Sequence, residues 1–337
     1  MKRRPLLSYA LILVALATMM LAAMCVGRFA VSIADVFRTI FGALLGSAPD
    51  LPVNVQTVVL QVRAPRVAAA LLVGAALAGA GSAYQCMFRN PLVSPDILGV
   101  SSGAALGAVA GIFFSQSVIA IQLFAFAGGL VAVAAVFAVG SALRGYDNTL
   151  TLILTGVVIG TLLGSGIALI KYLADPYNQL PAITFWLLGS LASIAPADVK
   201  LVAPLALLGV LPLWLLRSRI NLLSLPDDEA RSLGVNVTAM RIVVAVAATL
   251  VTAASVAVSG IIGWIGLLVP HMARMLVGPD FARLLPMALL IGAGYLLGVD
   301  TLARTMAQIE VPPGVLTALI GTPFFIWLLA VARRGWT

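Results

Sequence analysis

Charged side chains are scarce in this sequence. Only 9% of its 337 residues are Asp, Glu, Lys or Arg, whereas 62% are hydrophobic. Soluble domains carry about 25% charged residues, so this composition excludes a soluble globular protein and indicates a polytopic membrane protein. Histidine and cysteine are rarer still, because His271 is the single histidine and Cys25 and Cys86 both lie in apolar segments. A disulfide framework or a metal site on this chain is therefore not expected.

Motifs for using chemical energy are also missing. The sequence has no Gly-x-x-x-x-Gly-Lys and so lacks a P-loop for ATP, and no stretch between its apolar segments is long enough to form an ATPase. The apolar segments contain almost no Asp, Glu or His, which ion-coupled carriers place within the membrane. Asp300 and Glu310 come nearest, and both fall close to the outer ends of such segments. These absences predict a non-catalytic chain without a cofactor, which takes any energy it needs from a partner protein.

Ten apolar segments are candidates for membrane spans. A spanning helix needs about 20 apolar residues, which predicts an all-α polytopic membrane protein with one transmembrane domain over residues 1–337. The first segment is expected to remain as a helix, because its apolar run is long and no Ala-x-Ala cleavage site follows. Residues 27–62 are expected as an outer loop and residues 183–191 as a short surface or re-entrant helix. The candidate spans are residues 6–26, 65–88, 96–114, 118–140, 149–172, 197–216, 239–259, 261–277, 284–302 and 314–332.

Basic residues are distributed unevenly between the two sides of these spans. With the N-terminus inside, 13 of the 20 Lys and Arg residues fall on the cytoplasmic side and 7 on the outer side. This bias predicts that both termini are cytoplasmic, in agreement with an even number of spans. The basic residues occur singly or in pairs between apolar runs, which is typical of membrane topology and not of nucleic-acid binding.

Two runs of glycine recur at steps of four residues. Steps of four place side chains on one face of a helix, and glycine on that face lets another helix approach closely. Two interpretations remain open: helix packing alone, or packing between helices that also slide during transport. The two runs are Gly99, Gly103, Gly107 and Gly111 in the third span, and Gly156, Gly160 and Gly164 in the fifth.

The loop of residues 217–241 is the only sizeable one on the predicted cytoplasmic side. Ser224 and Asp227 have the spacing of a helix N-cap, and the acidic residues at 227–229 suit a helix N-terminus. Gly234 suits the end of the same helix. The pattern predicts a short helix at about residues 225–234 that contacts a partner; the alternative is a solvated helix in a loop.

Several ordered motifs between about Arg63 and Arg334 resemble the FecCD/vitamin B12-type permeases of ABC importers. The one departure is Trp264, where the family pattern has phenylalanine. The resemblance implies the type II ABC importer permease fold in a bacterial inner (plasma) membrane. It also implies a homodimer, two cytoplasmic ABC ATPase subunits that hold ATP and Mg, and a periplasmic substrate-binding protein. The motifs are RAPR, RNPLVSPDILGVSSGAALG, DDEARSLGVNV, GWIGLLVPHMARMLVGPDFARLLP and EVPPGVLTALIGTPFFIWLL.

The resemblance also implies roles for individual residues. Three arginines are expected at the outer surface, where they would attract carboxylates of the docking binding protein, although arginines at helix ends also serve as interfacial anchors; these are Arg63, Arg66 and Arg304. Contact with the ATPase is expected from Asp227, Asp228, Glu229, Ala230, Arg231, Leu233 and Gly234. Cytoplasmic gates are expected at two inner turns, for which a simple tight turn is the alternative; these contain Asn90, Pro91 and Leu92, and Asn148 and Thr149.

His271 and the substrate are less constrained. His271 follows Pro270, which should kink its helix, and a helix-end hydrogen bond is expected there, with a pH-sensitive role as the alternative. The resemblance implies an iron–siderophore chelate, haem, cobalamin or a molybdate-type oxyanion as cargo. Sparse charge disfavours a site that strips and holds a bare metal ion, so an iron chelate moved by ATP-driven alternating access is expected first. The alternative from another class is an ion-coupled secondary carrier.

Overall fold

The computed structural model describes residues 5–46, 51–143 and 148–333, and every regular element within these ranges is a helix. Each of the ten predicted spans coincides with a helix, so the prediction of an all-α polytopic fold is confirmed. The helices at these ten positions are α1 (Pro5–Cys25), α4 (Ala64–Met87), α5 (Val100–Phe113), α6 (Val118–Ala142), α7 (Asn148–Leu173), α9 (Pro196–Leu215), α12 (Val237–Ser259), α13 (Ile265–Val277), α14 (Phe281–Ala303) and α15 (Pro313–Arg333).

Seven of these helices are long and apolar enough to cross a membrane, whereas α5, α13 and the stretch Pro313–Trp327 of α15 are shorter. The span predicted at residues 96–114 is interrupted, which corrects the sequence-based boundary. Residues 95–98 form the short helix η2 (Pro95–Leu98), and Gly99 then adopts a left-handed conformation with φ of +76°. Because this conformation ends a right-handed helix, α5 begins only at Val100.

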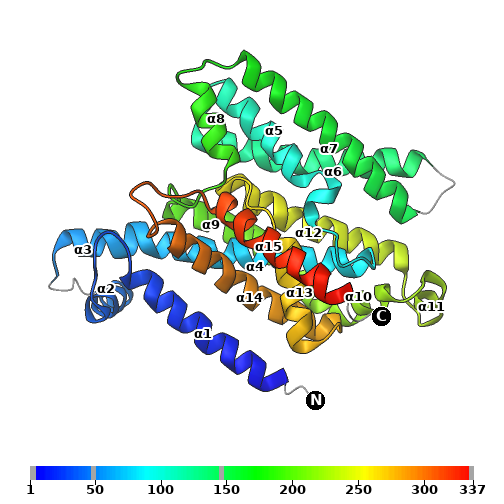
Figure 1. Cartoon of the computed structure of the whole chain (residues 1–337), viewed down its shortest axis with the longest axis horizontal. Coiled ribbons are helices and arrows are strands. Elements are labelled where there is room, and N and C mark those ends of the chain that lie inside the picture. Colours follow the sequence, from blue (N-terminus) through cyan, green and yellow to red (C-terminus); the bar gives the residue numbers. More distant parts are fainter. Residues whose placement is uncertain (1–4, 47–50, 144–147, 334–337) are drawn as a thin grey trace.

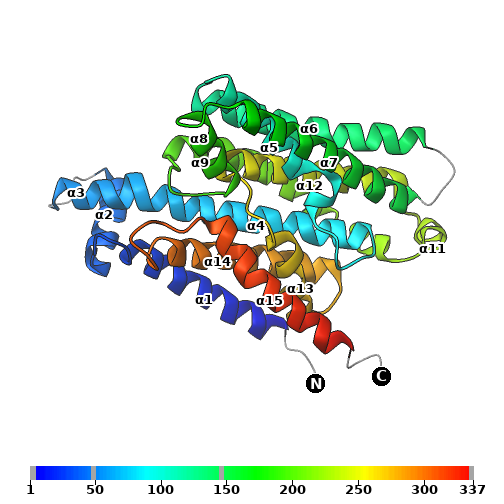
Figure 2. The same ribbon diagram turned by 45° about the horizontal axis from the view of Figure 1, so that its top comes forward.

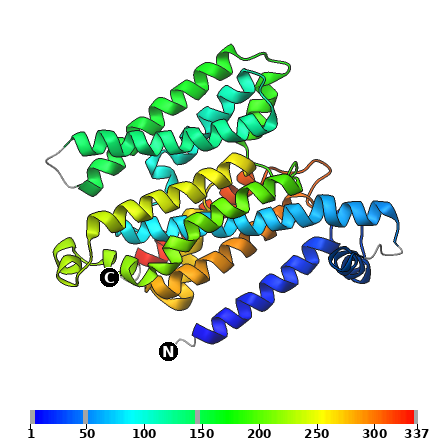
Figure 3. The ribbon, with the colours of Figure 1, turned by 180° about the vertical axis from the view of Figure 1, so that it is seen from behind.

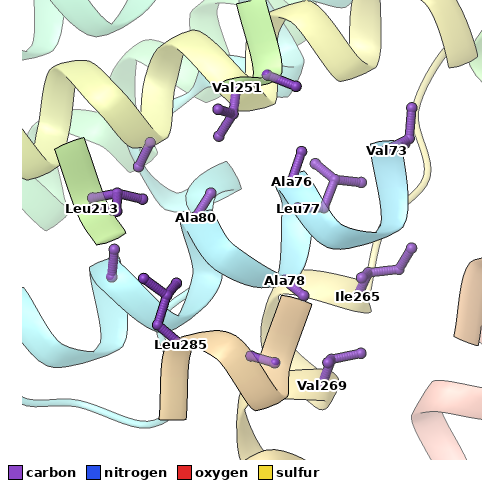
Figure 4. Packing of buried hydrophobic residues seen from close by; sticks show 14 of the residues in the cluster. Val73, Ala76, Leu77, Ala78, Ala80, Leu213, Val251, Ile265, Val269 and Leu285 are labelled. Carbon is purple, nitrogen blue, oxygen red and sulfur yellow. The ribbon is translucent and has the colours of Figure 1, made fainter. Parts of the chain in front are cut away.

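The helices pack in layers around α4 (Figure 2). Helices α9 and α12 cover one side of α4, and α13 and α14 cover the other. Helices α5, α6 and α7 lie beyond α12, whereas α1 lies beyond α14 on the opposite side (Figure 1). Figure 4 shows the core that results: Ala76 and Ala80 of α4 lie among Leu213, Val251 and Leu285 of three neighbouring helices.

Glycine lets α4 approach its neighbours at backbone distance. A Cβ added to Gly74 would lie 2.2 Å from the carbonyl oxygen of Gly292 in α14, and one added to Gly81 would lie 2.0 Å from that of Gly266 in α13. Neither contact leaves room for a methyl group, since a normal Cβ contact is near 3.5–4 Å. These two pairs, which the four-residue glycine pattern did not include, fix the centre of the bundle.

The glycines of the two predicted runs lie in four different environments. A Cβ on Gly103 or Gly107 would lie 2.4 or 2.0 Å from carbonyl oxygens of α6, and one on Gly156 would lie 2.0 Å from that of Ile97. Gly99 is outside the helical face, and Gly164 has no described atom near its missing Cβ. The remaining two have looser contacts: an added Cβ would lie 3.1 Å from Ile121 at Gly111 and 3.8 Å from Ser102 at Gly160.

The predicted outer loop of residues 27–62 contains helices, which corrects that expectation. Helix α2 (Ile33–Leu45) begins at Ser32, whose hydroxyl accepts a hydrogen bond from the Asp35 amide. Helix α3 (Val53–Thr57) and η1 (Val58–Arg63) then continue without a break into α4. In Figure 3 α2 is seen almost end-on while α1 runs along the bundle, so α2 lies across the bundle axis.

The ends of the bundle differ in content. The start of α1 and the end of α15 lie at the same end as α11 (Asp227–Ser232), and α2 and α3 lie at the opposite end (Figures 1 and 3). The short helix expected at residues 183–191 is present as α8 (Gln179–Leu187), about four residues earlier in the chain. We call the end with α11 the inner end and the end with α2 the outer end.

Candidate functional site

The predicted inner helix is present but is shorter than expected. The segment consists of α10 (Arg217–Asn221), η3 (Leu222–Ser224) and α11, which has six residues. The N-cap prediction for Ser224 is wrong, because its hydroxyl donates to the Asn221 carbonyl at 2.7 Å and Pro226 occupies the N-cap position. Proline fixes the backbone angle φ near −65°, which suits the residue where the chain enters a helix.

The end of α11 follows the sequence prediction more closely. Gly234 has φ of +81°, its amide donates to the Arg231 carbonyl at 2.9 Å, and the Val235 amide donates to the Ala230 carbonyl at 3.1 Å. This pair of bonds is the Schellman motif, in which glycine occupies the left-handed position. The helix therefore has a defined end, and its length is set by local sequence.

Helix α11 has one face packed against the bundle and one face exposed. Ala230 is fully buried against the bundle, whereas the side chains of Asp228 and Arg231 are 97% and 60% exposed. Leu233 is 60% exposed as well, and Glu229 is exposed next to them. Exposed acidic, basic and apolar groups thus lie together on a short helix at the inner end, where another protein has access to them.

Asp227 lies on the face of α11 that packs against the bundle, and it binds two arginines from other elements. Its carboxylate accepts hydrogen bonds from Arg89, which follows α4, and from Arg241 of α12 at 3.0 Å. Partial burial acts to raise the pKa of Asp227, but the hydrogen bonds and charges of Arg89 and Arg241 outweigh burial and hold the pKa below its usual value. The carboxylate is therefore ionised at neutral pH.

The predicted inner turn follows Arg89 directly. Arg89 is left-handed with φ of +51°, and its side chain also donates to the Leu223 carbonyl at 3.0 Å. The Asn90 side chain accepts from the Leu92 amide at 2.9 Å, which closes a tight turn around Pro91. Leu92 is 51% exposed. The second predicted turn contains Asn148 and Thr149, the first residues of α7, whose side chains lie outside the described part of the structure.

At the outer end, two of the predicted docking arginines bind the C-terminus of α1. Arg63 donates to the carbonyls of Met24, Cys25 and Phe29, with 3.0 Å to Cys25. Arg304 donates to the Ala23 carbonyl at 2.6 Å. The last carbonyls of a helix have no partner within the helix and carry partial negative charge, so two guanidinium groups satisfy both requirements.

The third arginine, Arg66, is enclosed by acidic groups. It binds both oxygens of Asp300 at 3.0 Å and approaches the Glu310 carboxylate at 2.8 Å. Arg63, Arg66 and Arg304 are only 4%, 6% and 8% exposed. The prediction that these three cations lie on the outer surface is wrong: their side chains point inward, because helix carbonyls and two carboxylates bind them.

A groove of about 680 Å³ opens between α8 and α15. Its lining is almost entirely apolar and includes Leu187, Leu188, Trp264, Val315 and Leu319. Trp264 has φ of +73°, a rare conformation for a bulky residue, and an added Cβ on Gly321 would lie 3.0 Å from its side chain. A large, weakly polar molecule fits such a surface better than a small hydrated ion does.

The described residues contain no cluster of metal-binding side chains, and His271 makes no hydrogen bond with them. Within residues 5–46, 51–143 and 148–333, no three His, Cys, Asp or Glu side chains lie close enough to hold a metal ion. His271 lies in α13 and is half-buried. The prediction of a helix-end hydrogen bond for His271 is not met by any group in these ranges.

Sequence reasoning missed the roles of Arg89 and Arg241. Both were counted only as basic residues of the inner side. Arg89 binds Asp227 from 138 residues away in the sequence, and Arg241 binds it from 14 residues away. A local signal existed for Arg89 alone: it precedes Asn-Pro and occupies the position after a helix where glycine is usual. No spacing rule connects it to Asp227.

The chain is similar to known transport proteins over most of its length. The family model described as the FecCD transport family matches residues 13–331. The chain is 44% identical over 281 residues to a probable iron chelatin transport system permease protein of Helicobacter pylori, covering 83% of this chain and 84% of that protein. It is 39% identical over 310 residues to a molybdate import system permease protein of Haemophilus influenzae, covering 92% and 91%.

The fold is similar to that of a solved transporter. A metal-chelate type ABC transporter in an inward-facing conformation matches with a TM-score of 0.85 and 37% identity, over 95% of this chain and 97% of that one. The family model, over residues 13–331, includes both the inner and the outer end of the bundle. This multi-pass membrane protein with its short inner helix therefore belongs to the FecCD transport family.

Proposed function

We propose that this chain is the permease subunit of an ABC importer that moves a metal chelate from periplasm to cytoplasm. The cargo we propose is an iron chelate. Two copies form the transport path in the inner membrane, with both termini cytoplasmic. Two ATPase subunits bind ATP and Mg and contact α11 through its exposed face. The single observation that carries this proposal is the inner helix, which exposes Asp228, Arg231 and Leu233 and is tied to the bundle through Asp227.

The groove beside α15 favours a chelate over an oxyanion. Its lining of leucine, valine and tryptophan side chains offers contact to a bulky organic ligand shell but few donors to a small anion such as molybdate. The similar proteins named for iron chelatin and for molybdate leave both cargo classes to be tested. Haem and cobalamin, which share the bulk of an iron chelate, are tested beside them.

The binding protein is proposed to dock at the outer end. Since Arg63, Arg66 and Arg304 are buried, their part is to fix the ends of α1, α4 and α14 that form the docking surface. Glu310, whose side chain is 36% exposed, is the group of this cluster that a partner contacts first.

The test is uptake into liposomes that hold the permease, its ATPase and its binding protein. Labelled ferric siderophore, haem, cobalamin and molybdate are compared, with and without ATP. We expect ATP-dependent uptake of one chelate, and loss of uptake when residues 225–234 are deleted or when the ATPase is inactivated. Uptake that persists without the ATPase would overturn the proposal in favour of a secondary carrier, and uptake of molybdate alone would change the cargo class.

A further inference from the structure

One carboxylate joins three elements at the inner end. Asp227 begins α11, Arg89 lies between α4 and the turn of residues 90–92, and Arg241 lies one turn into α12. We infer that the Arg89–Asp227 contact carries movement of α11 to this turn, so that it couples ATP use to opening of the path. This inference rests on the proposed function and names the residues that would transmit its motion.

The contacts are arranged so that Arg89 moves with α11. Arg89 donates to the carboxylate of Asp227 and, at 3.0 Å, to the carbonyl of Leu223, which lies just before α11. Movement of this segment must therefore displace Arg89 or break both hydrogen bonds. Asn90 is the next residue in the chain, so displacement of Arg89 reaches the turn through one peptide bond.

Arg241 gives the same carboxylate a second partner on a different helix. It lies 3.0 Å from Asp227, and the three side chains are only partly exposed, at 35% for Arg89, 30% for Asp227 and 22% for Arg241. Partial burial strengthens these ion pairs relative to fully solvated ones. Asp227 thus has one partner on α12, within the bundle, and one partner beside the turn of residues 90–92. A contact of this kind can transmit movement of α11 to the turn while α12 stays in place.

The backbone of Arg89 supports this role. Its amide donates to the Cys86 carbonyl, and the Asn90 amide donates to the Gln85 carbonyl, both at 3.2 Å. This is the same helix-ending motif found at Gly234, with arginine in the left-handed position that glycine fills more easily. A strained residue held in place by its side-chain contacts points to a function for that side chain. Here the side-chain contacts of Arg89 are those with Leu223 and Asp227.

Replacing Arg89 with glycine tests the effect of the side chain apart from the effect of the backbone conformation. Arg89→Gly removes both contacts while the turn keeps, or gains, stability, because glycine adopts positive φ without strain. Ser115→Gly is the matched control: Ser115 has φ of +52° and follows α5 at the outer end, away from α11. Asp227→Asn tests the other partner, and Arg89→Lys keeps the charge but loses the forked geometry.

The experiment measures uptake, ATPase activity and copurification of the ATPase for each variant in proteoliposomes. For Arg89→Gly we expect ATP hydrolysis within about twofold of the unmodified protein, and for both Arg89→Gly and Asp227→Asn we expect at least about tenfold less substrate moved per ATP. The double variant should lose no more than either single variant, because both remove the same contact. Arg89→Lys should fall between, and Ser115→Gly should equal the unmodified protein.

Three outcomes would overturn the inference. Unchanged substrate per ATP in Arg89→Gly would show that the contact transmits nothing. Parallel loss of uptake, ATPase activity and ATPase copurification would show that it only holds the docking surface. Losses that add in the double variant would show that the residues act separately. An unmodified protein without ATP-dependent uptake of any cargo would instead defeat the proposed function, so the two failures are distinguishable.

Discussion

Asp300 is fully buried in α14, where both of its oxygens accept hydrogen bonds from Arg66. Replacing Asp300 with asparagine leaves a buried guanidinium short of one negative charge. Breaking a buried ion pair by removing one partner costs about 3–5 kcal/mol, and we expect about 3 kcal/mol for Asp300→Asn because Glu310 still binds Arg66. Chemical unfolding of the purified protein in detergent measures this loss.

The control for this prediction is Arg38→Gln. Arg38 lies 4.0 Å from Asp35 and its side chain is 69% exposed, so its loss should change the free energy of unfolding by less than about 1 kcal/mol. Equal effects of the two substitutions would mean that burial adds nothing to the Arg66 pair.

Protonation of Asp227 gives a second prediction. Its two arginines lower its pKa in the folded protein relative to an unfolded value of about 3.9. The stabilisation is therefore complete above the unfolded pKa and disappears as the pH falls through the lower, folded value. We expect the melting-temperature difference between the unmodified protein and Asp227→Asn to be constant from about pH 7 to 5 and to shrink below about pH 4. A difference that instead shrinks as the pH rises toward 7 would contradict the depressed pKa.

At the scale of elements, the contact between α5 and α6 depends on glycine. A Cβ at Gly107 would lie 2.0 Å from the Phe124 carbonyl oxygen, so Gly107→Ala must push the two helices apart. Overpacking of this kind costs about 1–3 kcal/mol. Gly164→Ala in α7 has open space and should be neutral or stabilising, since alanine is favoured over glycine in helices by about 1 kcal/mol. Thermal unfolding of both variants checks the contrast, and it fails if the two melt alike.

Helix α2 exposes an apolar face. Phe37 and Phe41 are 47% and 56% exposed and Leu44 is 75% exposed, whereas Thr39 and Gly42 face the bundle. Because α2 lies across the bundle axis and contacts α1, we expect this face to rest in the lipid interface at the outer end. A fluorophore at Phe37→Cys should be quenched by lipid-attached nitroxide more strongly than one at Gln308→Cys, in a background lacking Cys25 and Cys86.

The elements differ in how far their sequence predicts them. Each span must satisfy its own backbone hydrogen bonds within the membrane, so the apolar runs identified helices at all ten positions, of which seven have the length and hydropathy of a span. Helix α2 escaped prediction because its 13 residues are too few for a span, although its amphipathic period, Ser32 at its start and Gly46 at its end were local signals of a helix. The interruption at Gly99 escaped because apolar composition continues through it, and only its backbone angle reveals the break.

At the scale of the molecule, the side chains that bind across long sequence distances could not be predicted. Arg66 and Asp300 are 234 residues apart, and Arg89 and Asp227 are 138 apart. Their spacing along the chain contains no period that marks them as partners. The three outer arginines were predicted as exposed docking residues, but they are buried, and the burial of Arg63 and Arg304 depends on where α1 ends in space, which local sequence does not specify.

The shared position of α11 and the chain ends gives a topological prediction. In a background without Cys25 and Cys86, Ser232→Cys in α11 should react with a membrane-impermeant maleimide only when the cytoplasmic side is open. Tyr177→Cys, whose native side chain is 87% exposed beyond α7, should react from the outside in intact cells. Labelling of both positions from one side would contradict an arrangement with α11 and residue 177 at opposite ends.

The two arginines that bind the end of α1 also have a consequence for how the chain is made. Both arginines lie later in the chain than the α1 carbonyls they bind. Arg63 follows 38 residues after Cys25, but the Arg304 that binds Ala23 follows 281 residues later. The end of α1 thus receives its second arginine only when α14 has been made, so we expect a chain truncated before residue 304 to hold α1 through Arg63 alone.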